Sequence, residues 1–329
     1  MTAPALGADR STTGPGGRIP RADLASVAVF LVLAFGLAWL VALPLWLGGG
    51  LADPAFTPTA LAMMATPAIA AVVVVFLVER PAHRARALGL WPLRPLGRLV
   101  GYVAAGIAVA MALVLVALPV GALFGVYPAD LTGLSGFRET LAAQLGPDRV
   151  PESVGPIVLA QLAVVPVAAV VGVLPALGEE IGWRGWLLPK LVPLGAVPAI
   201  LISGVAWGVW HAPVVLLGYN YPHAPGWLGV LSMVGMCTVV GAVFGWLRLR
   251  SGSVWPAAVA HSAFNATAGS YLLFAAAGAP VDTTRATVLG WSGWIVPLAV
   301  VVVLVATGRF GPATRPDAGL GARTRRHRS

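Results

Sequence analysis

Apolar stretches long enough to cross a bilayer recur along the chain, and no other feature constrains its fold so strongly. A bilayer core about 30 Å thick needs roughly 20 apolar residues per helix. With 58% apolar and only 10% charged residues, the 329-residue chain is unlike a water-soluble globule. The stretches are Leu24 to Leu47, Pro58 to Val78, Leu99 to Phe124, Val154 to Leu188, Val197 to Leu217, Trp227 to Leu247, Val254 to Ala275 and Thr287 to Thr307. The sequence therefore predicts an all-α, polytopic transmembrane helical bundle of about eight spans.

The chain divides into one transmembrane domain and two tails. Residues 1–22 are rich in Gly, Pro, Ser and Thr, and residues 308–329 are rich in Arg and Gly. Such compositions predict disordered cytoplasmic tails. The transmembrane domain is expected over residues 23–307, and the motifs described below fall within about 150–275. The longest loop, about residues 126–152, is expected to hold a short helix from Gly136 to Leu145.

The distribution of basic residues predicts the orientation in the membrane. An even number of spans places both termini on one side, and cytoplasmic loops carry an excess of Lys and Arg. With both termini in the cytoplasm, 18 of the 21 basic residues fall on that side, and only Arg138, Arg149 and Arg285 fall outside. We therefore expect an integral protein of a cytoplasmic membrane, bacterial in type, with lipid as its partner. Topology accounts for the net charge of +9, so nucleic acid is not an expected partner.

Ionisable side chains inside the predicted spans are few. An ionised group at mid-membrane costs about 2.5–3.5 kcal/mol on insertion scales, so each one is a candidate for function. Among the twelve acids, only Glu179 and Glu180 lie within a span away from its edges, and among the five histidines only His211 and His261 do. The costly residues are thus concentrated in the fourth, fifth and seventh predicted spans.

Helical spacing pairs these residues with particular neighbours. Glu180 and Arg184 stand at i,i+4 on one face, while Glu179 points about 100° away. Trp207 and His211 share a face, as do His261 and Asn265. Each pattern alone has a plainer explanation, either a charge cluster at a helix end or hydrogen bonds between packed helices. Together, a carboxylate, two imidazoles and an amide are the groups that activate a water and stabilise an oxyanion, directly or through a metal.

These motifs resemble those of the CPBP family of intramembrane proteases, named for CAAX prenyl proteases and bacteriocin-processing proteins and also called Abi. The family has Glu-Glu-x-x-x-Arg, an aromatic residue separated from a His by three residues, and His-x-x-x-Asn, on three successive helices. Here they read Glu179-Glu180 with Arg184, Trp207 with His211, and His261 with Asn265. The second departs from the family, which more often has Phe where Trp207 stands.

The resemblance implies an intramembrane endopeptidase that hydrolyses membrane-associated proteins or peptides. It implies that Glu179 and His211 activate the water, that His261 and Asn265 stabilise the oxyanion, and that Glu180, Arg184 and Trp207 support them. The family includes both metalloproteases and glutamate proteases. A divalent metal such as zinc, held by Glu179, His211 and His261, is therefore one expectation, and a metal-free site is the other.

Three further expectations concern the site as a whole. No second carboxylate is expected to orient a histidine, which slightly disfavours a zinc site. Six of the motif residues are expected to converge in a water-filled cavity that opens toward the cytoplasm. They are Glu179, Glu180, Arg184, His211, His261 and Asn265. The alternatives are a non-proteolytic scaffold or escort of the same fold and, less favoured, a transporter. Prenylated C-terminal peptides, bacteriocin leader peptides and membrane-bound signalling peptides are all compatible substrates.

Overall fold

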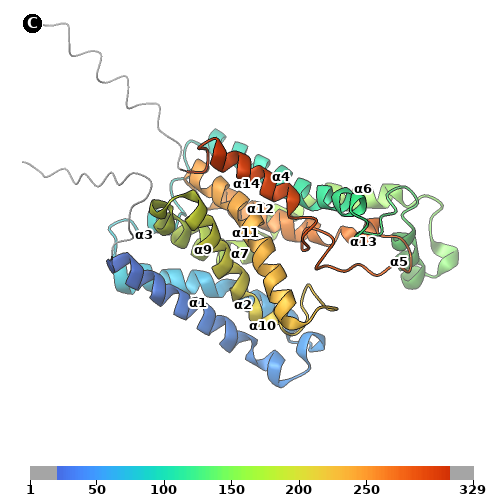
Figure 1. Ribbon diagram of the computed structural model, residues 1–329, viewed down its shortest axis with the longest axis horizontal. Helices are drawn as coiled ribbons and strands as arrows, with labels where there is room; N and C mark the ends of the chain where they lie inside the picture. The colour runs from blue at the N-terminus through green and yellow to red at the C-terminus, as the bar shows by residue number, and fades with distance from the viewer. Residues whose placement is uncertain (1–20, 312–329) are drawn as a thin grey trace, which may run out of the picture.

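A computed structural model describes residues 21–311 of the chain as a bundle of helices (Figure 1). Its main helices are α1 (Arg21–Leu47), α2 (Phe56–Val73), α3 (Arg84–Ala87), α4 (Leu96–Leu123), α5 (Ser135–Leu145), α6 (Gly155–Val171), α7 (Val173–Glu180), α8 (Leu188–Leu191), α9 (Ala196–Trp210), α10 (Ala212–Val215), α11 (Gly226–Ser251), α12 (Trp255–Ala268), α13 (Tyr271–Phe274) and α14 (Ile295–Ala306). A π-helical segment, Ile181–Leu187, joins α7 to α8. The all-helical prediction is confirmed, and α5 falls where the loop helix was expected. Residues 1–20 and 312–329, which hold most of the two predicted tails, lie outside the described residues.

Four helices are long and apolar enough to cross a bilayer: Asp23–Leu47, Phe56–Glu79, Leu96–Leu123 and Gly226–Ser251. The pair Gly155–Val171 and Val173–Leu194, which bends by 57°, adds a fifth crossing if it is counted as one span. Large apolar side chains such as Val32, Leu40 and Val171 are exposed on α1 and α6, as lipid-facing residues are. The chain is thus a polytopic membrane protein.

The predicted count of eight spans is not matched by eight long helices in the described residues. The fifth, seventh and eighth predicted spans hold α9, α12 and α14, with 15, 14 and 12 residues. At 1.5 Å per residue, each helix spans about 18–23 Å and falls short of the hydrocarbon core. Hydropathy does not detect a break in a helix. The apolar sequence continues from α9 into α10 and from α12 into α13, so each pair was predicted as one continuous span. Eight crossings therefore stay a prediction.

The two ends of the bundle differ in composition. The start of α1, the end of α14 and α3 lie together at the left of Figure 1, and α5 and α13 lie at the right. Lys190 of α8 ties the first of these ends together through ion pairs with Asp23 at 2.6 Å and Glu79 at 2.7 Å. Arg98 donates to the carbonyl of Arg250, which joins the start of α4 to the end of α11. We call this the basic end and the opposite one the far end.

Close approach of helix backbones depends on glycines. Gly178 and Gly182 face α2, where an added Cβ at Gly182 would lie 2.5 Å from the Pro67 Cβ and 2.7 Å from its carbonyl oxygen. Gly204 and Gly208 meet Thr238 and Val234 of α11 in the same way. Small residues at this spacing are how membrane helices pack tightly. They fix the helices that carry Glu179 and His211 against the rest of the bundle.

We expect Gly182→Ala to destabilise the protein by about 1–3 kcal/mol, because the new methyl group overlaps rigid Pro67 atoms rather than a flexible side chain. The measurement is the unfolding midpoint of the purified protein in one detergent. Gly36→Ala in α1 is the matched control, since nothing lies within 4 Å of a Cβ there. An equal midpoint for the two variants would contradict the packing described.

Candidate active site

The two neighbouring acids lie on a helix that turns into the bundle. The chain bends after α6 at Gly172, and the following α7 ends at Glu180. The side chains of Glu179 and Glu180 are 2% and 0% exposed. Arg184, one turn later, donates to Glu180 Oε1 at 2.8 Å, which confirms the predicted i,i+4 pair. Glu179 points elsewhere, as its position on the helix predicts.

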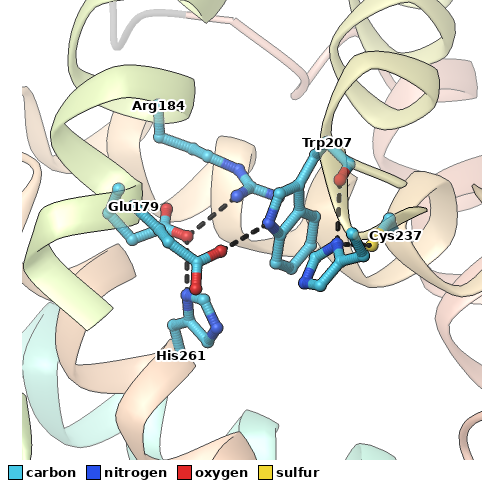
Figure 2. A network of polar contacts seen from close by, with 7 residues as sticks. Glu179, Arg184, Trp207, Cys237 and His261 are labelled. Carbon is cyan, nitrogen blue, oxygen red and sulfur yellow. Dashed lines mark hydrogen bonds and ion pairs between the residues drawn. The ribbon is translucent and has the colours of Figure 1, made fainter. Parts of the chain in front are cut away.

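Glu180 also holds His261 of α12. The His261 Nδ1 lies 2.9 Å from the same Oε1 that pairs with Arg184 (Figure 2). This corrects the expectation that no second carboxylate orients a histidine. Residues 180 and 261 are far apart in sequence, and α7 packs directly on α12. Glu180, which local spacing pairs with Arg184, therefore also binds His261.

Trp207 joins Glu179 to His211. Its indole Nε1 donates to Glu179 Oε2 at 2.7 Å, and its carbonyl oxygen lies 2.9 Å from His211 Nδ1. The helix α9 ends at Trp210, and α10 begins at Ala212. Pro213 lies just after this break and has no backbone N–H to donate to the helix, which favours a break here. His211 thus sits at a helix break, with one ring nitrogen held by its own chain.

The helix α11 supplies part of the site that the sequence analysis did not identify. The Arg184 guanidinium lies 3.9 Å from the centre of the Trp207 ring, a cation–π contact. Gly241 of α11 leaves the space for this stack, because an added Cβ there would lie 2.5 Å from an Arg184 nitrogen. Phe244 stacks on His261 with ring centres 5.6 Å apart. Neither residue carries a charge in its span, so the search for ionisable groups passed over them.

A cavity of about 580 Å³ adjoins these groups. Glu179, Trp207, His211, His261 and Asn265 line it, whereas Glu180 and Arg184 do not. Asn265 is exposed and His211 is partly exposed. Four of the six residues predicted to share a cavity therefore line it, and the Glu180–Arg184 pair does not.

The cavity lies toward the far end of the bundle, away from the basic loops. Its opening toward the cytoplasm stays a prediction. Its remaining lining includes Leu51, Phe56, Tyr219, Asn220 and Leu289, from the connections between α1 and α2, α10 and α11, and α13 and α14. His211 lies at the end of α9 that is remote from the basic loops, and Glu179 lies near the end of α7.

Tyr219 in the lining of this cavity is a further residue that sequence reasoning missed. Burial raises the pKa of its hydroxyl, and the Glu179 carboxylate raises it further. The group therefore stays protonated at neutral pH as a hydrogen-bond donor beside the cavity. Its position in a connecting segment outside the motifs gave no signal in the sequence.

Residues 161–267 match the family described as type II CAAX prenyl endopeptidase Rce1-like. The chain carries an Rce1-like region. It contains all seven of the motif residues, from Glu179 to Asn265, and covers α7 and α9 and most of α6 and α12. No curated protein matches the chain. The match supports an endopeptidase activity and agrees with the resemblance read from the motifs.

The side chains of the Rce1-like region that could ligate a metal are Glu179, His211 and His261. Glu, His and His are ligands that zinc accepts, and both histidines have Nδ1 held by another group, as metal-binding histidines do. Within residues 21–311, however, no three His, Cys, Asp or Glu side chains stand close enough together to hold a metal ion. Trp207 occupies the space beside Glu179 (Figure 2). The chemistry of these side chains therefore fits a metal, whereas their spacing does not.

Proposed function

We propose that the protein is a glutamate-dependent intramembrane endopeptidase that hydrolyses membrane-associated peptides or proteins. The observation that supports it most is the shared cavity, where one buried carboxylate, two imidazoles and one amide meet. Buried ionisable groups in a membrane protein are costly, and a site of catalysis or transport explains their retention. The Rce1-like match favours hydrolysis.

The hydrogen bonds of the two histidines suggest which nitrogen faces the reaction. A carbonyl oxygen only accepts, so His211 Nδ1 carries the hydrogen and Nε2 keeps its lone pair in the neutral ring. Glu180 likewise favours the hydrogen on His261 Nδ1. In this proposal His211 Nε2 accepts a hydrogen bond from the attacking water and holds it next to Glu179.

The charge balance of the site leaves one proton free to move. Glu179 and Glu180 carry two negative charges when ionised, and Arg184 cancels one of them. The cluster is neutral when one more proton resides on Glu179 or His261. On His261 this proton makes Nε2 a donor, which suits the ring for stabilising an oxyanion.

The reaction then follows the usual course of peptide hydrolysis. Glu179 removes a proton from the water while the water oxygen forms a bond to the carbonyl carbon of the substrate. The oxyanion of the tetrahedral intermediate accepts hydrogen bonds from His261 Nε2 and the Asn265 amide. The C–N bond breaks as protonated Glu179 returns the proton to the leaving nitrogen, which yields a carboxylic acid and an amine. Trp207 positions Glu179, and Glu180 positions His261.

The proposal is tested with purified full-length protein in lipid nanodiscs and a quenched fluorescent peptide library. Hydrolysis at defined bonds, established by mass spectrometry, is the expected result. Its absence from the whole library, together with normal folding and a cell phenotype restored by inactive variants, would favour the scaffold alternative.

We expect hydrolysis to survive removal of metal, because the donors in the described residues do not form a metal-binding group. The protein is dialysed against a strong chelator, and its rate and metal content are measured on the same sample. A loss of rate that is restored by stoichiometric zinc would overturn the metal-free form of the proposal and leave endopeptidase activity intact. Asp53, in the loop between α1 and α2, provides a control for nonspecific chelator effects: Asp53→Asn should respond as the unmodified protein does.

A further inference from the structure

The charges of the protein are separated between its two ends. The basic end holds Arg80, Arg84, Arg86, Arg94, Arg98, Lys190, Arg248, Arg250 and Arg309 among the described residues. The connections at the far end hold Asp53, Asp130, Glu139, Asp148, Glu152 and Asp282, with Arg138, Arg149 and Arg285. Loops rich in Lys and Arg stay in the cytoplasm during insertion. The charge pattern therefore assigns the basic end to the cytoplasm and the far end to the opposite side.

The path from the site to the basic end is filled by side chains. Trp183, Trp186 and Leu187 of the π-helical segment are at most 2% exposed. Phe30 of α1 packs against both tryptophans, with ring centres 5.4 Å and 4.9 Å apart. The side chains of the Glu180–Arg184 pair are buried as well. No described cavity residue belongs to the loops of the basic end.

At the far end, the cavity adjoins a second one. A neighbouring cavity of about 470 Å³ lies beneath α5 and is lined by Glu139, Thr140 and His223. Both cavities are lined by Pro222, Tyr271 and Leu272, so the two are adjacent across these three residues. An extended chain with its scissile bond beside Glu179 would reach this polar outer pocket by passing Leu272, which lines both cavities.

We infer that the substrate is a polypeptide segment that reaches the site from the non-cytoplasmic side of the membrane, with the flanking residues seated in the outer pocket beneath α5. This inference rests on the proposed endopeptidase function and narrows its substrate class. A prenylated C-terminus on the cytoplasmic face would meet the closed, aromatic end of the site. A segment that emerges from the outer leaflet meets the open end.

The experiment uses single cysteines in the full chain and a membrane-impermeant maleimide on intact bacterial cells. Leu272→Cys probes the junction of the two cavities, where Leu272 is 57% exposed. Ala85→Cys in the exposed α3 probes the basic end. Cys237 is buried and remains in place, and the otherwise unmodified chain serves as the blank. Thr140→Cys, in the outer pocket, is the second variant in case Leu272→Cys does not accumulate.

We expect Leu272→Cys to be labelled in intact cells and Ala85→Cys only after permeabilisation. Labelling should also abolish hydrolysis by purified Leu272→Cys and leave that of Ala85→Cys unchanged, because the bulky adduct blocks the route. The reverse labelling pattern, or a Leu272→Cys that stays unlabelled even in permeabilised cells, would overturn the inference. Labelling requires no activity, so a failure of the endopeptidase proposal would show separately, as absent hydrolysis before any reagent is added.

Discussion

Replacing Glu179 by Gln should reduce peptide hydrolysis by a factor of about 100 or more and leave the fold intact. The amide oxygen of Gln still accepts the hydrogen bond that Trp207 Nε1 now donates to Glu179 at 2.7 Å. What disappears is the basicity that takes a proton from water. The measurement is the initial rate on a cleaved library peptide, with the unfolding midpoint of the same preparation as the test of folding.

The matched control for this substitution is Glu152→Gln. Glu152 is an exposed acid in the loop before α6 and lines neither cavity, so its variant should hydrolyse at the unmodified rate. His211→Ala should lose activity as Glu179→Gln does, because it removes the proposed acceptor for the water. Glu179→Gln with an unreduced rate would exclude Glu179 as the base. Full rescue of a cell phenotype by both inactive variants at normal membrane levels would favour the scaffold.

Local spacing predicted the contacts within one helix and missed those between helices. The Glu180–Arg184 bond follows from an i,i+4 interval, and so does the contact of Trp207 with His211. The bond from Glu180 to His261 depends on how α7 crosses α12, which no interval within a helix specifies. The same holds for Gly241 and Phe244, which are ordinary residues of an apolar helix until Arg184 and His261 pack against them.

Hydropathy likewise located the apolar segments and could not locate their breaks. The chain turns at Gly172 and again at His211, and these breaks set the depth and direction of Glu179 and of the histidine. If the spans were continuous helices, the depth of each site residue would follow from its distance in sequence to the basic loops. The break after α9 instead leaves His211 toward the far end, where the cavity is lined by connecting segments.

The largest effect on stability is expected from separating Glu180 and Arg184. Both side chains are buried, at 0% and 3% exposed, and their bond is 2.8 Å long. Removal of one partner from a buried pair leaves an uncompensated charge and costs about 3–5 kcal/mol. Arg184→Met should show this loss, increased by the contact it gives up with the Trp207 ring. Glu180→Gln should show a smaller loss, because the amide oxygen still accepts from Arg184.

The double variant Glu180→Gln with Arg184→Met separates charge from packing. If the pair acts as a unit, the loss in the double variant is smaller than the sum of the two single losses by about 1–3 kcal/mol, because no unpaired charge remains. The measurement is the free energy of unfolding in one detergent at one pH. Arg250→Met, at the basic end and partly exposed, is the control and should change the free energy by about 0.5 kcal/mol or less. Strict additivity would mean that the two side chains contribute independently, and Glu180 would then hold His261 without help from Arg184.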